Sequence, residues 1–98
     1  MITNLKDEEQ HKHRNGGGWV ANTAKVEDSV YVGPFALVYG HAELTGKVRV
    51  LDLGQVSGHA KLSGNVIVSG NAWIDKGTHH TGLFNKNDRV QEKQTRIR

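Results

Sequence analysis

The chain has 98 residues, no cysteine and a formal net charge of +3 at pH 7. This length predicts one domain, and the lack of cysteine excludes disulfides, thiolate catalysis and cysteine-ligated metal sites. The mild positive charge suits an anionic partner without requiring one. No apolar run is long enough to cross a bilayer and no signal peptide is recognisable, so we expect a soluble, cytoplasmic protein without membrane contact.

Residues 1–18 are expected to form a short cap and lead-in ahead of the main body of the chain. Large apolar residues are sparse in this segment, and most of it is charged or polar. Thr3 or Asn4 could cap a short helix whose first turn carries Asp7 and Glu8, because side-chain oxygens satisfy free N–H groups and acidic residues suit the positive end of a helix dipole. We therefore predict a short helical or irregular cap.

The most cationic segment runs from His11 to Arg14 and is followed by Asn15 and three glycines. The glycines could form an anion-binding nest of backbone N–H groups flanked by positive side chains. The simpler interpretation is a solvated linker that needs glycine to bend into the first strand. Both interpretations stay open at this point.

Residues 19–79 carry a repeat with a period of six residues. An aliphatic residue occupies every sixth position, in the order Val20, Val26, Val32, Val38, Leu44, Val50, Val56, Leu62, Val68 and Ile74. Two residues before each of these, from Val26 onward, stands a small or β-branched residue: Ala24, Val30, Ala36, Ala42, Val48, Gly54, Ala60, Val66 and Ala72. Apolar spacing of 3.6 residues is absent, which excludes an α-helix here. Internal repeats of this kind indicate a β-helix built from hexapeptides.

One hexapeptide shows how the repeat would fold. Successive side chains of a strand point to opposite faces, so Ala42 and Leu44 would point inward while Glu43 and Thr45 point outward. Gly46 would then turn the corner, where the backbone needs a positive φ. The same corner position holds Gly40, Gly58, Gly64 and Gly70, or Asp28 and Asp52. Aspartate also tolerates that conformation comparatively well.

After Ile74 the repeat decays. Thr78 is expected to keep the small inward position, and His80 to replace the aliphatic residue. Leu83 and Phe84 would cover the last coil, whose unpaired strand edge would otherwise invite further stacking. The basic tail that follows is most simply a solvated one. No aromatic interleaving supports a nucleic-acid partner.

Three hexapeptides make one triangular coil of 18 residues, and this pattern resembles the left-handed parallel β-helix of the hexapeptide-repeat family. Acyltransferases and gamma-class carbonic anhydrases share that fold. The segments 57–66 (SGHAKLSGNV) and 69–74 (SGNAWI) are similar to the "SGNAxVxG" runs of uncharacterised bacterial and phage hexapeptide proteins. Residues 15–20 resemble the lead-in that such proteins carry.

The resemblance implies an all-β, single-domain fold, a left-handed parallel β-helix of about three and a third coils with short capping segments. The β-helix would span residues 19–79. Residues 1–18 would form the N-terminal cap and lead-in, and residues 80–98 the C-terminal cap and basic tail.

The coils would assign outward side chains to three faces of a prism. The first face presents Lys25, Glu27, Glu43, Thr45, Lys61 and Ser63, an ordinary solvated surface. The second presents Tyr31, Gly33, Arg49, Leu51, Ile67 and Ser69. The third presents Trp19, Leu37, Gln55 and Trp73 in one row, with Ala21, Tyr39, Ser57 and Asp75 beside it.

Apolar residues occupy outward positions that a monomer would normally make polar. The predicted interface consists of Trp19, Phe35, Leu37, Leu51, Leu53 and Ile67. A contiguous exposed patch of this kind marks an interaction surface. The family resemblance implies a parallel homotrimer, whose closed symmetry also supplies the buried area that a short stack of coils lacks. Alternatively, the terminal segments fold back over the patch.

His41 and His59 are 18 residues apart, so both would lie at the corner between the third and first faces. Adjacent coils would bring them to about 4.8 Å, the usual strand spacing. The pair could bind a phosphate or carboxylate, act as a general base, or offer two metal ligands. A zinc site needs a third protein ligand, and this corner offers only Thr23 and Gly77, so no metal site is predicted.

The predicted ligand site combines His41, His59, Lys47, Arg49, Tyr39 and Trp73. Positive charge would hold a phosphate, and the aromatic faces would hold a base. We therefore expect a non-catalytic trimer that sequesters a small anionic, nucleotide-like ligand in clefts between subunits, in the manner of phage-encoded sequestering proteins. No cofactor is expected.

Two other functions are compatible with the sequence. The first is a hexapeptide acyltransferase-like enzyme with His41 or His59 as general base, although the protruding loop that the resemblance implies for such enzymes does not interrupt this repeat. Gamma-class carbonic anhydrases need three histidines at a spacing that this pair does not reproduce. The second is a scaffold or inhibitor that docks a protein partner through Trp19, Leu37 and Trp73.

Overall fold

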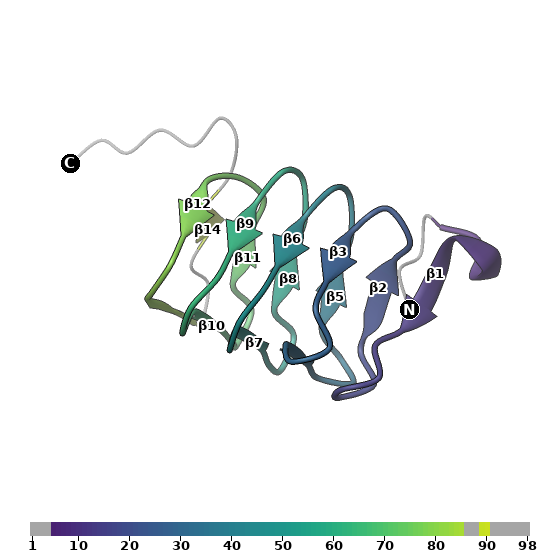
Figure 1. Cartoon of the computed structure of the whole chain (residues 1–98), viewed down its shortest axis with the longest axis horizontal. Helices are drawn as coiled ribbons and strands as arrows, with labels where there is room; N and C mark the ends of the chain where they lie inside the picture. The colour runs from purple at the N-terminus through teal and green to yellow at the C-terminus, as the bar shows by residue number, and fades with distance from the viewer. Residues whose placement is uncertain (1–4, 86–88, 91–98) are drawn as a thin grey trace.

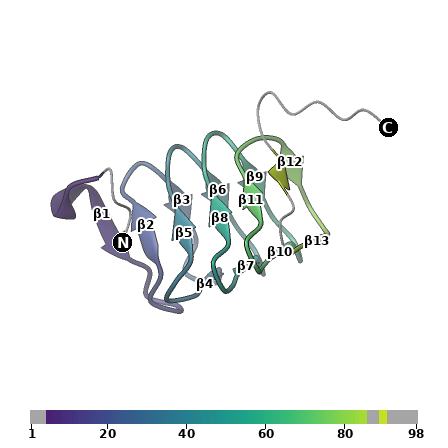
Figure 2. The same ribbon diagram turned by 180° about the vertical axis from the view of Figure 1, so that it is seen from behind.

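The computed structural model describes residues 5–85 and 89–90 and is an all-β solenoid of parallel strands with about four turns (Figure 1). Each turn adds one short strand to each of three sheets. Seen from behind, the coils follow one another along the long axis in the same order (Figure 2). The predicted all-β coiled architecture is confirmed, and the number of turns is close to the three and a third expected.

A single 3₁₀ turn, η1 (Asp7–Glu9), precedes the strands. The first sheet contains β3 (Lys25–Val26), β6 (Glu43–Leu44), β9 (Lys61–Leu62) and β12 (Thr78–His79). The second contains β4 (Tyr31–Val32), β7 (Arg49–Val50), β10 (Ile67–Val68) and β13 (Leu83–Phe84). The third contains β1 (Gln10–Lys12), β2 (Trp19–Ala21), β5 (Leu37–Val38), β8 (Gln55–Val56), β11 (Trp73–Ile74) and β14 (Arg89–Val90).

The two inward series of the repeat form the core. Every member from Val20 to Ile74 is buried except Val26, which is half-buried on the first strand of the first sheet. Most of these residues are valine, whose branched side chain suits a strand. Burying one such side chain contributes roughly 1.5–3 kcal/mol. The predicted inward positions within the repeat are therefore confirmed.

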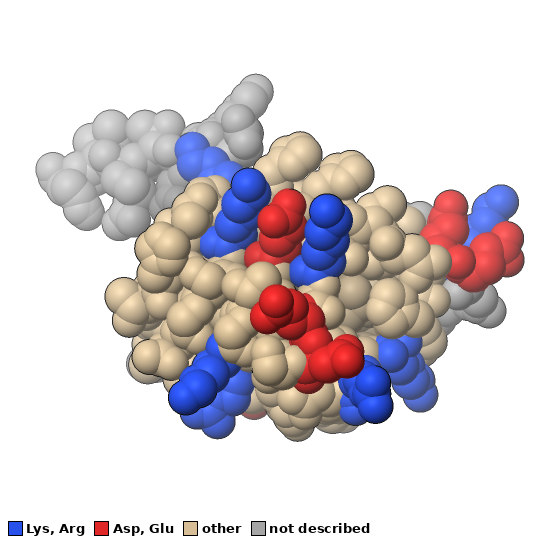
Figure 3. Space-filling model, viewed as in Figure 1, with Lys and Arg blue, Asp and Glu red and all other residues tan. Residues whose placement is uncertain are grey.

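Residues 18 apart in sequence pair on adjacent coils, as the repeat predicts. The rows run through Trp19, Leu37, Gln55 and Trp73 on the third sheet, through Tyr31, Arg49 and Ile67 on the second, and through Lys25, Glu43 and Lys61 on the first. The first sheet alternates in charge, and Figure 3 shows a red side chain between two blue ones over β9, β6 and β3. Opposite charges on neighbouring strands stabilise the pairing.

Backbone hydrogen bonds join each coil to the next in one direction. Lys25 N donates to Ala42 O at 2.8 Å, and Glu43 N donates to Ala60 O at 2.9 Å. Because these N–H groups point toward the following coil, the first coil presents carbonyl oxygens that no earlier coil can satisfy. Buried carbonyls need partners, so this end of the solenoid requires donors from elsewhere.

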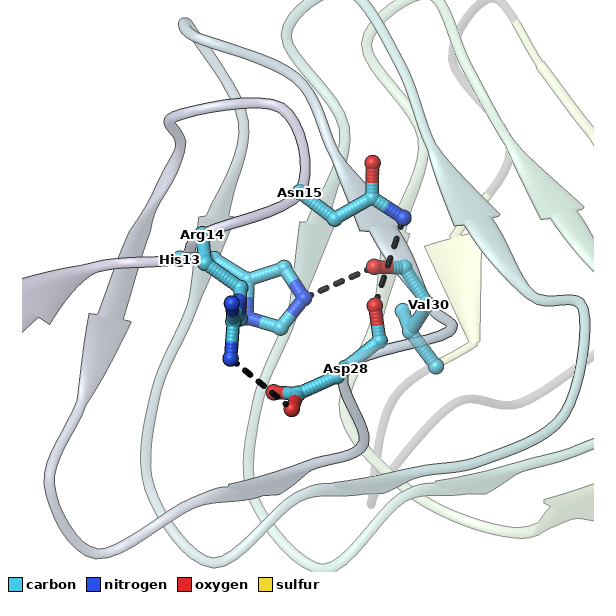
Figure 4. A network of polar contacts seen from close by, with 5 residues as sticks. All are labelled: His13, Arg14, Asn15, Asp28 and Val30. Carbon is cyan, nitrogen blue, oxygen red and sulfur yellow. Dashed lines mark hydrogen bonds and ion pairs between the residues drawn. The ribbon is translucent and has the colours of Figure 1, made fainter.

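The lead-in, residues 13–18, supplies such donors (Figure 4). The buried His13 ring places Nε2 2.7 Å from Val30 O, so Nε2 carries the hydrogen in this contact. Gly18 N donates to Val32 O at 2.9 Å. The lead-in therefore closes the carbonyl end of the second sheet.

The glycines of the lead-in bend the chain, and two of their amides are already bonded. Gly16 and Gly17 have φ values of +113° and +82°. Gly17 N donates to His13 O at 3.0 Å, and Gly18 N is taken by Val32 O. An anion nest built from these amides is therefore absent. The linker interpretation holds for the bend, but Gly18 is buried against the first coil and is not solvated.

The cap before the lead-in is less helical than expected. The N-cap position of η1 is Lys6, and Glu9 Oε1 accepts a hydrogen bond from Lys6 N at 2.9 Å. Strand β1 then pairs antiparallel with β2 and covers that edge of the third sheet. The two predicted cap residues, Thr3 and Asn4, lie outside the described residues.

The corners adopt positive φ values where the repeat predicts them, except at Asp28. Asp52 has a φ of +55°, and the glycines with values between +60° and +71° are Gly40, Gly46, Gly58, Gly64 and Gly70. Asp28 is not in the left-handed region, so the prediction for it was wrong. The lead-in fixes this corner instead, because Arg14 forms an ion pair with the Asp28 carboxylate at 3.3 Å and Asn15 Nδ2 donates to Asp28 O at 3.3 Å.

The last coil is shorter than 18 residues, which corrects the prediction for its inward residues. Thr78 pairs with Lys61 and is exposed, and His79, not His80, takes the position next to Leu62. Each pair is one residue short of the period. By β13 the shortening reaches two residues, since Leu83 pairs with Ile67.

The predicted apolar cover of this coil is only half confirmed. Phe84 packs against the core, whereas Leu83 points outward and is 59% exposed. The shortened coil places Leu83 in the outward row of the second sheet.

Gly58→Ala is expected to destabilise the protein more than Gly17→Ala. Both positions have a positive φ, +62° and +82°, so both substitutions introduce a left-handed strain of about 1–2 kcal/mol. A Cβ at Gly58 would also lie 2.2 Å from Asp75 O on the next coil, whereas nothing lies within 4 Å of a Cβ at Gly17. Urea unfolding should show a loss that is larger by about 1 kcal/mol or more for Gly58→Ala. Equal losses would contradict the close coil-to-coil contact.

His13→Ala should destabilise the protein by about 1–3 kcal/mol, because it leaves the Val30 carbonyl without its donor in a buried site. The matched control is His11→Ala. His11 is exposed, and its ring contacts Asn22 Oδ1 at 2.7 Å, so its loss should cost less than about 1 kcal/mol. Thermal unfolding followed by circular dichroism measures both, and similar losses would rule out the capping role of His13.

Candidate anion-binding groove

A groove of about 480 Å³ runs along the corner between the first and second sheets. It is lined by Asn15, Ser29, Tyr31, Lys47, Arg49, Asn65 and Ile67. Three successive coils contribute two residues each, and the lead-in contributes Asn15. The groove therefore exists only where the lead-in meets the stacked coils.

Strand register explains how these side chains come together. Tyr31, Arg49 and Ile67 form one outward row across β4, β7 and β10. Lys47 precedes Arg49 by two residues and lies on the corner, so both side chains leave the same coil on the same side. Neighbouring coils lie about 4.8 Å apart. The two cations therefore sit in the middle of the groove, with one coil on either side.

The two cations of the groove are not neutralised by acidic neighbours. Lys47 and Arg49 are exposed, and neither makes a hydrogen bond or ion pair with another described residue. None of the lining residues is acidic. The first sheet differs, because Glu43 lies between its two lysines. The groove is therefore a site of uncompensated positive charge.

Tyr31 forms the aromatic wall of the groove and is half-buried. A Cβ added at Gly16 would lie 3.1 Å from its Cε1 atom, and one added at Gly33 would lie 3.6 Å from its Cε2 atom. The two glycines thus leave room for the ring to lie close to the backbone on both sides. This contact restricts the ring's position, so the groove has a preformed aromatic surface.

Two polar side chains near the N-terminal end of the groove are held by backbone carbonyls. Ser29 Oγ donates to Gly46 O at 2.7 Å. Asn15 Nδ2 donates to Asp28 O, and Figure 4 shows the amide oxygen of Asn15 directed away from that contact. The Asn15 amide oxygen is therefore an oriented hydrogen-bond acceptor.

The predicted histidine pair is confirmed as a pair of neighbours. The rings of His41 and His59 stack with centroids 5.3 Å apart and planes 9° from parallel, and both residues are exposed. They lie at the corner between the third and first sheets, at the other end of β6 and β9 from Lys47. Among the described residues, no group of three histidine, cysteine, aspartate or glutamate side chains could hold a metal ion.

The six residues of the predicted ligand site fall into separate regions within one chain. Lys47 and Arg49 line the groove, and the histidine pair lies on another corner. Tyr39 and Trp73 lie on the third sheet, where Tyr39 Oη donates to Gln55 Oε1 at 2.9 Å and Trp73 Nε1 donates to Ser57 Oγ at 2.8 Å. A single copy does not join these regions into one site.

Sequence reasoning missed four of the lining residues, namely Asn15, Ser29, Tyr31 and Asn65. The 18-residue offset that places Tyr31 beside Arg49 was available, and it would have identified Tyr31, Ser29 and Asn65. No sequence signal placed Asn15, because its position depends on the fold of the lead-in.

The apolar corner, defined as Phe35 and Leu53 between the second and third sheets, is exposed as predicted. The side chains of Phe35 and Leu53 are 74% and 56% exposed. The other members of the predicted interface, Trp19, Leu37, Leu51 and Ile67, are half-buried on the adjoining sheets. The described part of the terminal segments thus leaves the corner uncovered.

The described residues contain no helix with the length and apolarity to cross a bilayer. The resemblance to hexapeptide-repeat proteins rests on the repeat and its motifs alone. No protein-family model, curated protein or solved structure matches this chain.

Proposed function

We propose that this chain is a non-catalytic binding protein for a small anionic ligand and that it works as a homotrimer of left-handed β-helices. The observation that carries the proposal is the pair of cations, Lys47 and Arg49, in a groove without an acidic residue. Two adjacent positive charges without a partner repel each other, and an anion between them relieves that repulsion. Arginine and lysine also bind phosphate through charge-assisted hydrogen bonds.

Binding is favoured over catalysis by the chemistry of the lining residues. They include no histidine, carboxylate or thiol that could serve as a general base or nucleophile. His41 and His59 lie on another corner, so an acyltransferase-like reaction in the groove would need them from a neighbouring copy.

The trimer rests on the apolar corner. Phe35 and Leu53 project from the solenoid with most of their surface in water. Covering each of them would contribute roughly 1.5–3 kcal/mol per copy. Closed cyclic symmetry lets three such corners cover one another.

A threefold axis at the apolar corner would also unite the residues of the predicted ligand site. The second sheet of one copy would then face the third sheet of the next across a cleft. Lys47 and Arg49 would stand on one wall of that cleft. Tyr39, Trp73 and the histidine pair of the neighbouring copy would stand on the other wall.

Replacing both Lys47 and Arg49 by alanine should weaken the binding of inorganic phosphate by about tenfold or more, since each charged hydrogen bond contributes roughly 1.5–3 kcal/mol. The matched control replaces Lys25 and Lys61, which removes the same charge from the first sheet and should change affinity by less than about twofold. Isothermal titration at low ionic strength measures both. Equal weakening by the two double variants would indicate a general charge effect, and a wild-type protein that binds no phosphate would overturn the proposal.

Replacing Phe35 and Leu53 by aspartate should convert the trimer to monomer, because six carboxylates would then meet around one axis. Thr45→Asp is the control, because Thr45 is exposed on the first sheet, away from the apolar corner. Native mass spectrometry gives the oligomeric state of each variant. A monomeric wild-type protein would contradict the trimer and favour a protein partner at this corner, and a variant that stays trimeric would place the interface elsewhere.

A further inference from the structure

We infer that the ligand of the groove is a nucleoside phosphate, with its base on Tyr31 and its phosphate on Lys47 and Arg49. This inference rests on the proposed function, since it requires that the groove binds an anion. It adds the chemical class of the ligand and assigns a recognition role to Tyr31, which the cations alone do not need.

The first argument is the aromatic wall. A site for inorganic phosphate needs charge and N–H or O–H donors, and it gains nothing from an aromatic ring. Tyr31 nevertheless lines the groove, with glycine at both positions where a side chain would press on the ring. A ring held in this way offers a stacking surface whose ordering cost has already been met in folding. Bases stack on such surfaces regardless of their identity.

The second argument is the distance between the aromatic wall and the cations. Tyr31 and Arg49 pair directly on adjacent strands, so their side chains leave the backbone about 4.8 Å apart. A ligand that uses both needs a planar ring joined to an anionic group by a short spacer. The ribose of a nucleoside 5′-phosphate is a spacer of that kind, and it is flexible enough to let the phosphate reach Lys47 as well.

The third argument is the set of uncharged groups around the ring and the cations. Ile67 follows Arg49 in the same row and gives the groove a second apolar surface. Asn15 and Asn65 contribute amides, which can donate to and accept from the edge of a base or a ribose hydroxyl. A polyphosphate chain or an inorganic anion would leave these groups unused. A nucleoside phosphate has a ring, hydroxyls and an anion, so it matches each of them.

The test is to compare ligands that share a phosphate and differ in what is attached to it. Inorganic phosphate, ribose 5-phosphate and the 5′-monophosphates of adenosine, guanosine and uridine are titrated into the full-length protein. Three proteins are used: wild type, Tyr31→Leu, which keeps an apolar side chain without a π-face, and Tyr31→Phe, which keeps the π-face.

At least one nucleoside monophosphate should bind the wild type about tenfold or more tightly than ribose 5-phosphate, which is the gain expected from one stacked base. Tyr31→Leu should lose that gain and Tyr31→Phe should keep it. Affinity for inorganic phosphate should be equal in all three proteins, which also shows that the variants are folded.

Two outcomes would overturn the inference, and they are distinguishable. If the nucleotides bind no more tightly than ribose 5-phosphate while inorganic phosphate still binds, the ligand class is wrong and the anion-binding function stands. The class is also wrong if the nucleotide advantage survives in Tyr31→Leu. If neither inorganic phosphate nor any nucleotide binds the wild type, the proposed function fails, and the inference fails with it.

Discussion

The whole structure depends on the stacking of one 18-residue coil on the next. Backbone N–H groups of each coil donate to carbonyls of the following coil, and aliphatic columns such as Val32, Val50 and Val68 fill the space inside. These two interactions reinforce each other, because a shift in register would break the hydrogen bonds and misalign the column together. Outward residues at the same offset must then stand in rows, and each functional feature of this surface is such a row or a corner between rows.

The direction of the backbone hydrogen bonds links the fold to the groove. It leaves carbonyls at the start of the solenoid, and the lead-in covers them through His13 and Gly18. The same segment carries Asn15 into the groove and places Gly16 against the ring of Tyr31. One short segment thus closes the end of the solenoid and completes the site. Damage to the cap would therefore disturb ligand binding as well as stability.

The distribution of charge separates the candidate site from the rest of the prism. On the first sheet, Glu43 lies between Lys25 and Lys61, so that row is neutralised by its own members. On the corner beside it, Lys47 and Arg49 have no such neighbour among the described residues. Both arrangements come from the same repeat, and only the second leaves positive charge free for a ligand.

The sequence by itself determined the core, the three faces and the rows, because alternation along a strand and a six-residue period leave little freedom for side-chain direction. Only the tertiary structure decided what breaks the period: the shortened last coil that puts His79 beside Leu62, the negative φ of Asp28, and the lead-in folded over the first coil. These features depend on contacts between segments that share no repeat, so no local pattern encodes them. The groove belongs to both groups, since Arg49 and its row follow from the period whereas Asn15 is placed by the fold of the lead-in.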